Sequence, residues 1–149
     1  MFIIEDFLSD GDLIVFGTIF LISTILGLIS YVFSSIALFT MSTNAGISKP
    51  WLAWIPIANV WIIGELVTDK LRGNGGMKYL IVTAIYILAF SIPYVKVIAS
   101  IAYSIFAILV IYWIFTKHSN KPVLHTILSA IIPLYSAITL FIIRNNEEK

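Results

Sequence analysis

Long apolar runs separated by short polar segments dominate the hydrophobic pattern. The first run, 13–41, contains no charged residue. About 20 apolar residues cross a bilayer at ~1.5 Å each, so this run predicts a spanning helix with residues to spare. Three later runs, 79–94, 97–115 and 123–143, predict further spans, and Pro133 is expected to kink the last of them. No internal repeat is evident among these runs.

A shorter apolar segment, 51–66, is predicted to lie in the membrane plane or to enter the membrane and return. Its apolar core runs from Trp51 to Gly64, which is 14 residues and short for a span. Pro56 also interrupts helical hydrogen bonding there. On a helical projection, one face would carry three indoles, which favour the headgroup region, and a carboxylate: Trp51, Trp54, Ala58, Trp61 and Glu65.

These patterns predict an all-α integral membrane protein. It would have about four transmembrane helices, one short interfacial or re-entrant Trp-rich helix, and a single domain over 1–149. The composition agrees, because 60% of the residues are hydrophobic and 11% are charged, with a mean hydropathy of +1.01. A soluble domain carries about 25% charged residues. No basic run suggests nucleic acid, and no basic n-region suggests a cleavable signal peptide.

The distribution of basic residues provides a separate prediction of topology. If 51–66 does not cross and the N-terminus lies outside, six basic residues are cytoplasmic and three (Lys96, Arg144 and Lys149) are not. If the segment crosses, the best orientation gives five against four. The non-crossing arrangement is therefore favoured, with both chain termini outside the plasma membrane. The six basic residues are Lys49, Lys70, Arg72, Lys78, Lys117 and Lys121.

Polar residues within 51–66 are the first candidates for function. Glu65 could be a proton- or cation-binding carboxylate, since ionisable groups at membrane depth are costly and often functional. Alternatively, the carboxylate of Glu65 could lie at the membrane interface near Lys70. Pro56 and Asn59 could form a helix break that exposes carbonyl groups to a ligand, as in some transporters. Alternatively, Asn59 could satisfy the backbone groups that Pro56 frees. For each residue the structural interpretation is favoured.

His125 lies near the start of the last predicted span. A hydrogen bond at the cytoplasmic interface accounts for it better than a proton relay. His118 lies seven residues earlier, but neither histidine has a neighbouring carboxylate or cysteine, so neither a metal site nor a cofactor is expected.

Small residues recur at spacings of three and four along the first run. Such residues let helix backbones approach closely. Packing within the chain is favoured over a dimer interface. The residues are Ser23, Gly27, Ser30, Ser34 and Ala37.

The stretch GISKPWLAWIPIAN at 46–59 follows a pattern found in a known group of proteins. It resembles the G-I-x-x-P-W-L-A-W-I-P-I-A-N stretch of uncharacterised small polytopic membrane proteins of Gram-positive bacteria. The ending LHTILSAIIPLYSAITLFIIRNN at 124–146 resembles them as well. The resemblance implies a bacterial plasma-membrane location, and it transfers neither an activity nor a catalytic residue.

No catalytic constellation is found, and enzymatic activity is not expected. The glycines of RGNGGMK at 72–78 lack the spacing of a phosphate-binding loop. The favoured function is a non-enzymatic one: an accessory protein, a subunit of a membrane complex, or an immunity-type protein acting on a membrane-active peptide. The alternative is a minimal transporter or channel built on the Pro56, Asn59 and Glu65 break. The expected partners are the lipid bilayer and another membrane protein or peptide.

Overall fold

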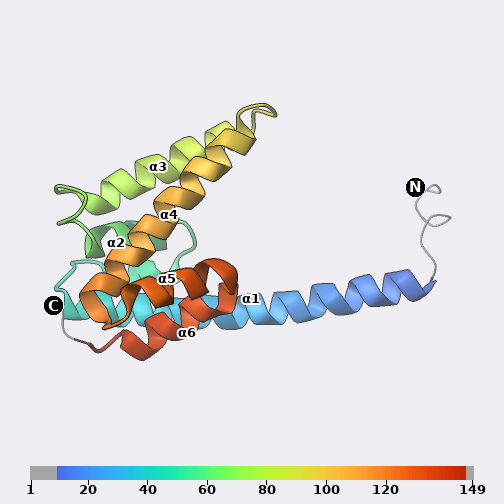
Figure 1. The fold of residues 1–149 in the computed structure, drawn as a ribbon, viewed down its shortest axis with the longest axis horizontal. Coiled ribbons are helices and arrows are strands. Elements are labelled where there is room, and N and C mark those ends of the chain that lie inside the picture. Colours follow the sequence, from blue (N-terminus) through green and yellow to red (C-terminus); the bar gives the residue numbers. More distant parts are fainter. Residues whose placement is uncertain (1–9, 147–149) are drawn as a thin grey trace.

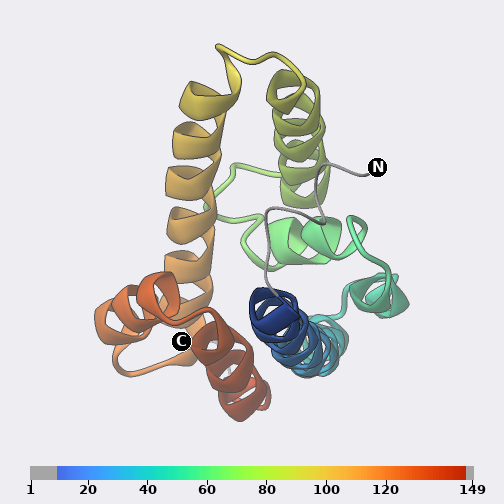
Figure 2. The ribbon, with the colours of Figure 1, turned by 90° about the vertical axis from the view of Figure 1, so that its right-hand side faces the viewer.

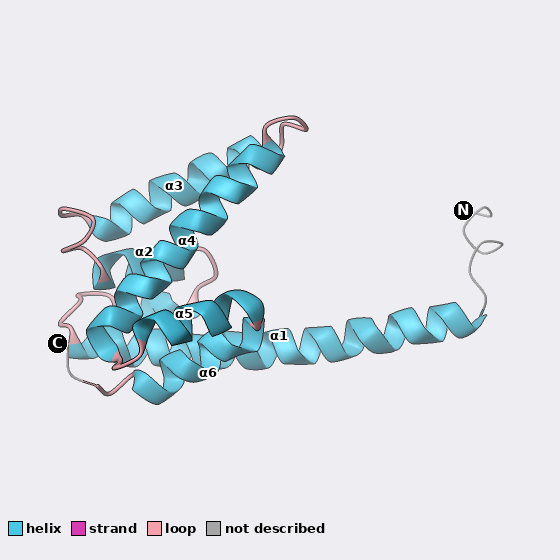
Figure 3. Cartoon of the chain, viewed as in Figure 1, coloured by secondary structure: helices cyan, strands magenta, loops and turns pink. Residues whose placement is uncertain are grey.

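The computed structural model describes residues 10–146. Residues 1–9 and 147–149 lie outside this part of the chain, and with them Lys149, which enters the topology argument. The described residues form helices and no strand (Figure 3), which confirms the all-helical class. The elements are α1 (Asp10–Asn44), the 3₁₀ helix η1 (Pro50–Trp54), α2 (Asn59–Leu66), α3 (Gly75–Phe90), α4 (Lys96–His118), α5 (Pro122–Ile131) and α6 (Pro133–Ile143).

Helix α1 contains the whole predicted run 13–41 and is about 52 Å long at 1.5 Å per residue. Its C-terminal part packs against α6, η1 and α2. Its N-terminal part projects from the molecule, and every residue from Gly11 to Ile29 is exposed (Figure 1). About half of the longest apolar helix is therefore exposed in the part of the chain that the structure describes.

Helices α3 and α4 form an antiparallel pair that diverges from α1 (Figures 1 and 2). An aromatic cluster joins them: the rings of Tyr86 and Tyr103 stack with centroids 4.3 Å apart. The hydroxyls of Tyr103 and Thr83 are also hydrogen-bonded at 3.1 Å. Helix α4 contains the predicted run 97–115, while α3 begins four residues before the predicted run 79–94 and ends four residues before its end.

The predicted helix 123–143 is wrong as a single kinked element. The structure has two helices, α5 and α6, and the chain reverses between them (Figure 1). Ile132 is extended (φ −117°, ψ 103°), as the residue before a proline tends to be, and Pro133 has no N–H to continue the helix. His125 Nδ1 and Tyr135 Oη lie 2.8 Å apart. Residues ten apart on one helix would be separated by about 15 Å.

The predicted helix 51–66 is also wrong as one element, because η1 and α2 are separate. Ile55 before Pro56 is extended, and Ile57 has φ 71°, a strained left-handed conformation for a β-branched residue. The predicted tryptophan face consequently does not form. Trp51 and Trp54 are 55% and 44% exposed, whereas Trp61 on α2 is half-buried.

The path of this segment nevertheless turns back toward its start. Just before this segment the chain is still at the C-terminal end of α1, where the Ile47 amide donates to Ser42 O. Farther along, the Tyr31 hydroxyl donates to Trp54 O. Since Tyr31 precedes Ser42 by 11 residues, Trp54 lies roughly 16 Å back along α1. The segment then returns through α2.

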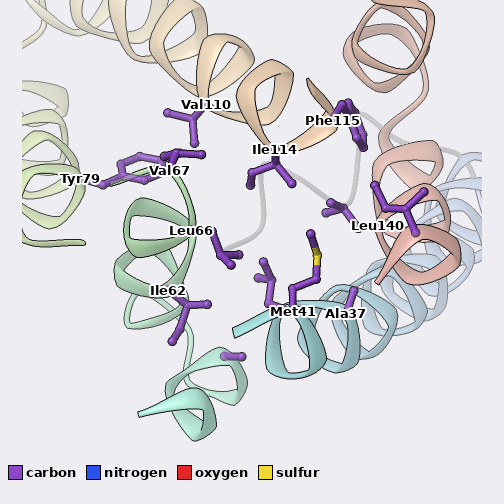
Figure 4. Packing of buried hydrophobic residues seen from close by; sticks show 13 residues of the cluster. Ala37, Met41, Ile62, Leu66, Val67, Tyr79, Val110, Ile114, Phe115 and Leu140 are labelled. Atoms are coloured by element: carbon purple, nitrogen blue, oxygen red, sulfur yellow. The ribbon is translucent and has the colours of Figure 1, made fainter. Parts of the chain in front are cut away.

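The buried core lies where these elements converge. Residues of α1, α2, α4 and α6 interdigitate there, with Ile62, Met41, Ile114 and Phe115 almost inaccessible (Figure 4). Outside this core the surface is strongly apolar. By length and composition, two helices of the described chain can cross a membrane, 11–44 and 96–118. In the most apolar 18-residue stretch of the first helix no residue is buried, and in that of the second helix 11% of the residues are buried.

Candidate functional site

A polar cavity lies at the end of the molecule where α1, α2, α4 and α6 all end. Its volume is about 550 Å³, and we call it the C-terminal basin. Its walls carry charged and amide side chains from all four helix ends or the residues just after them. They include Asn44, Glu65, Asp69, Lys117, His118 and Arg144.

Lys117 is the cation at the centre of this network. Its Nζ donates to the carbonyl oxygen of Leu66 at 2.9 Å and to Asp69 Oδ1 at 2.7 Å. The free carbonyls at a helix C-terminus carry partial negative charge, which a cation stabilises. Lys117 therefore joins the C-terminal end of α4 to that of α2. Burial raises the pKa of Asp69, but the hydrogen bond and charge of Lys117 outweigh this and leave that pKa lowered.

Two asparagine side chains make similar links at the same end. Asn44 Nδ2 donates to Arg144 O at 3.4 Å, joining the end of α1 to the residue after α6. Asn146 Nδ2 donates to His118 O at 2.7 Å. The Arg144 guanidinium lies 3.7 Å from the ring centroid of Phe141, as a cation–π pair. The basin thus holds several helix ends together.

Glu65, the leading candidate from the sequence, caps the start of α3. Its Oε1 accepts a hydrogen bond from the Gly76 amide at 3.0 Å, and its Oε2 accepts one from Thr68 Oγ1 at 3.2 Å. Asn74, the residue before α3, makes no side-chain cap hydrogen bond. A carboxylate at a helix N-terminus satisfies a free amide and complements the helix dipole. The expected neighbour Lys70 instead lies 3.5 Å from Asp69.

Three glycines allow this close contact between α2 and α3. A Cβ on Gly64 would lie 2.4 Å from Gly75 O, and a Cβ on Gly75 would lie 2.1 Å from Gly64 O. A Cβ on Gly76 would meet the Trp61 ring at 2.6 Å. From the sequence, the glycines of 72–78 were only excluded as a phosphate-binding loop, and their contact with α2 was not predicted. The sequence signal for that contact is Gly64, which stands next to the carboxylate of Glu65.

The other candidate residues are not gathered at the basin. Pro56 and Asn59 lie at the break between η1 and α2, and Trp54 lies beside Tyr31, so none of the three lines the basin. His125 pairs with Tyr135 and packs against the Phe115 ring, with centroids 5.6 Å apart. His125 is therefore hydrogen-bonded, while its position at a membrane interface stays a prediction.

The small-residue stripe of α1 is packed only at its C-terminal end. Ser23 and Gly27 are exposed, and a Cβ on Gly27 would meet nothing within 4 Å. Ser30 and Ser34 are half-buried, and Ala37 is fully buried. Packing within the chain thus accounts for Ala37 but not for Ser23 or Gly27.

Within residues 10–146, no group of three or more histidine, aspartate or glutamate side chains could hold a metal ion. No protein-family model matches the chain, and neither does any curated protein or solved structure. Interpretation of the site therefore depends on the geometry above.

Proposed function

We propose that this chain is an integral membrane protein that acts by binding another membrane component rather than by catalysis. Apolar helices that project from a small polar base support this proposal. On α1 alone, residues such as Ile14 and Phe20 are 69% and 74% exposed. Burial of apolar area is the dominant favourable term in folding, so this much exposed apolar surface requires an apolar surrounding or partner.

The orientation follows from the basic residues. Seven of the eight lysines and arginines in the described chain lie on the segments that meet at the basin, whereas Lys96 starts α4 at its far end. Basic residues are enriched on the cytoplasmic side of membranes. We place the basin in the cytoplasm and the start of α1 outside. The seven residues are Lys49, Lys70, Arg72, Lys78, Lys117, Lys121 and Arg144.

The apolar residues 13–29 of α1 form the surface that we assign to a partner, and their exposure in the described chain is the observation on which the function depends. The accessory or subunit role fits a helix that is long enough to span but packed along only half its length. Ser23 and Gly27 would allow close approach of a second helix there. A membrane-active peptide, as in an immunity-type role, would use the same surface.

The transporter alternative has less support. The carboxylate of Glu65 already accepts hydrogen bonds from Gly76 N and Thr68 Oγ1, which gives this residue a structural role. The break at Pro56 and Asn59 does not open into the basin.

Replacing Gly27 with leucine tests the partner surface. The new side chain has free space within the chain, so its folding is expected to be unchanged. The stoichiometric complex purified in mild detergent from native membranes should lose at least tenfold in yield. Gly17→Leu is the matched control: it also meets nothing within 4 Å, but it lies about 120° around the helix from Ser23. A complex equally unaffected by both variants, or no complex at all, would contradict the proposal.

A further inference from the structure

The two segments that reverse direction share a sequence pattern. The end of α1 reads FTMSTN at 39–44 and the end of α4 reads FTKHSN at 115–120, which is F-T-x-x-[S/T]-N in both. Each is followed by Lys-Pro, at 49–50 and 121–122, with a leucine two residues after the proline. Each then reaches Ile-Pro followed by an aliphatic residue, at 55–57 and 132–134. This repeat is not evident from the sequence alone, because the spacings between its motifs differ in the two segments.

The backbone repeats at the same positions. Lys49 has φ −135° and ψ 60°, and Lys121 has φ −131° and ψ 59°. Residues before proline usually have ψ between about 120° and 160°, so both lysines depart from the common value in the same way. Ile55 (φ −102°, ψ 119°) and Ile132 (φ −117°, ψ 103°) match as well. The two segments are therefore similar in conformation at both of their Lys-Pro and Ile-Pro junctions.

The packing repeats too. After Lys-Pro, η1 packs on α1, the helix that precedes it, and α5 packs on α4, the helix that precedes it. The return limbs differ in their main partner: after Ile-Pro, α2 packs mostly against α3, whereas α6 packs mostly against α1. Both return limbs end at the basin, where Leu66 O and Arg144 O accept from Lys117 and Asn44 of the other copy. Each copy is thus one long helix followed by a hairpin that comes back to the end it left (Figure 1).

We infer that the hairpins of the two copies, 49–66 and 121–143, are equivalent re-entrant elements. Both insert into the cytoplasmic leaflet and bind its acyl chains. This inference rests on the proposed membrane location. Helices α1 and α4 are then crossings, and α3 is a third and shorter one, because the chain has to return from the basin to the far end of α4. The C-terminal end lies on the cytoplasmic side. The expected outside position of Arg144 would then be wrong, since this residue joins the other basic residues at the basin.

The dimensions of the second hairpin fit one leaflet. Helix α5 has 10 residues and spans about 15 Å, half of a hydrocarbon core of about 30 Å. Its tip is apolar and accessible: Ile131 is 70% exposed and Ile132 is 47% exposed. Its base carries Lys121 and Arg144, which suit anionic headgroups. An acyl-chain environment is therefore the occupant that the exposed tip and the basic base favour together.

Single cysteines can test this inference cleanly, because the chain has no native cysteine. Tyr94→Cys, Asn120→Cys and Asn145→Cys would be labelled with a membrane-impermeant maleimide in sealed vesicles of known orientation. We expect Asn120→Cys and Asn145→Cys to react from the same side and Tyr94→Cys to react from the opposite side. If Asn145→Cys reacts from the side of Tyr94→Cys, the second hairpin crosses, and both the inference and the cytoplasmic placement of Arg144 are wrong, while the proposal of a membrane protein that binds a partner through α1 stands. If all three react from one side, the crossing of α4 and the proposed membrane arrangement fail.

A second measurement concerns the lipid contact itself. A fluorophore on Ile131→Cys should be quenched at least twofold more strongly by a nitroxide in the middle of the acyl chain than by one on the headgroup. Asn145→Cys, at the base of the same hairpin, should show the reverse order. Equal quenching at both positions would exclude insertion of the hairpin.

Discussion

Replacing Gly64 with alanine tests the contact between α2 and α3, on which the position of Glu65 depends. The added Cβ would lie 2.4 Å from Gly75 O and 2.8 Å from Gly76 Cα, and both are backbone atoms that cannot rotate away. Overpacking of this kind costs about 1–3 kcal/mol, and two rigid backbones place it near 3 kcal/mol. Alanine regains about 1 kcal/mol in helix propensity. The net loss in unfolding free energy should be about 2 kcal/mol.

Unfolding in mixed micelles titrated with denaturing detergent measures this loss, with tryptophan fluorescence as the signal, since Trp61 lies at the contact. Gly27→Ala is the matched control: it makes the same change within a helix, but its Cβ meets nothing within 4 Å. The control should be neutral or stabilising by up to about 1 kcal/mol. If Gly64→Ala is as stable as the wild type, or if both variants are destabilised alike, the close-contact argument is refuted.

Three further predictions follow from the hydrogen bonds. Glu65→Gln keeps a hydrogen-bond acceptor for α3 but removes the charge, so the unfolding free energy should fall by about 0.5–1 kcal/mol. Glu65→Ala removes the acceptor as well and should cost about twice that in the same titration. Equal losses for the two variants would contradict the capping role. The pKa of Asp69 is lowered, so its pair with Lys117 stabilises the fold above the unfolded pKa and loses this contribution as the pH falls through the folded value. Asp69→Asn should therefore be a few tenths of a kcal/mol less stable than wild type at pH 6, and the difference should shrink as the pH falls below 3.8. A difference that does not shrink on acidification would argue against the pair. Tyr135→Phe removes the hydroxyl that meets His125 and should cost about 1 kcal/mol, while no measurable loss would show that packing alone holds this hairpin.

Helix positions were predictable where local chemistry alone decides them. The run 13–41 is apolar, free of charge and free of proline, and the structure has α1 there. The same holds for α4 and the run 97–115. In these segments periodicity and length are sufficient, because no tertiary contact is needed to choose between helix and another element.

The two Ile-Pro junctions show where such reasoning fails. Proline alone predicts a kink or a break, and the outcome depends on what the second limb can pack against. After Pro133 the second limb reverses and packs on α1, with Tyr135 meeting His125. The contacts with α1 join residues far apart in the sequence, and no local pattern contains them.

The partner of Glu65 was hidden for a similar reason. The sequence placed Lys70 nearby, but the carboxylate binds the Gly76 amide, 11 residues later. That choice depends on the missing side chains of Gly64 and Gly75, which let two backbones meet. A pairing of glycines on separate elements becomes visible only when the fold is known.

The reversal of the chain after α5 is the feature on which both the proposed topology and the hairpin repeat depend. A distance between spin labels at Asn120 and Asn145, measured in lipid nanodiscs, tests it most directly. Since Asn146 Nδ2 lies 2.7 Å from His118 O, the two labels should be close, well below 30 Å. A distance of about 33 Å, the length of one continuous 22-residue helix, would contradict the account.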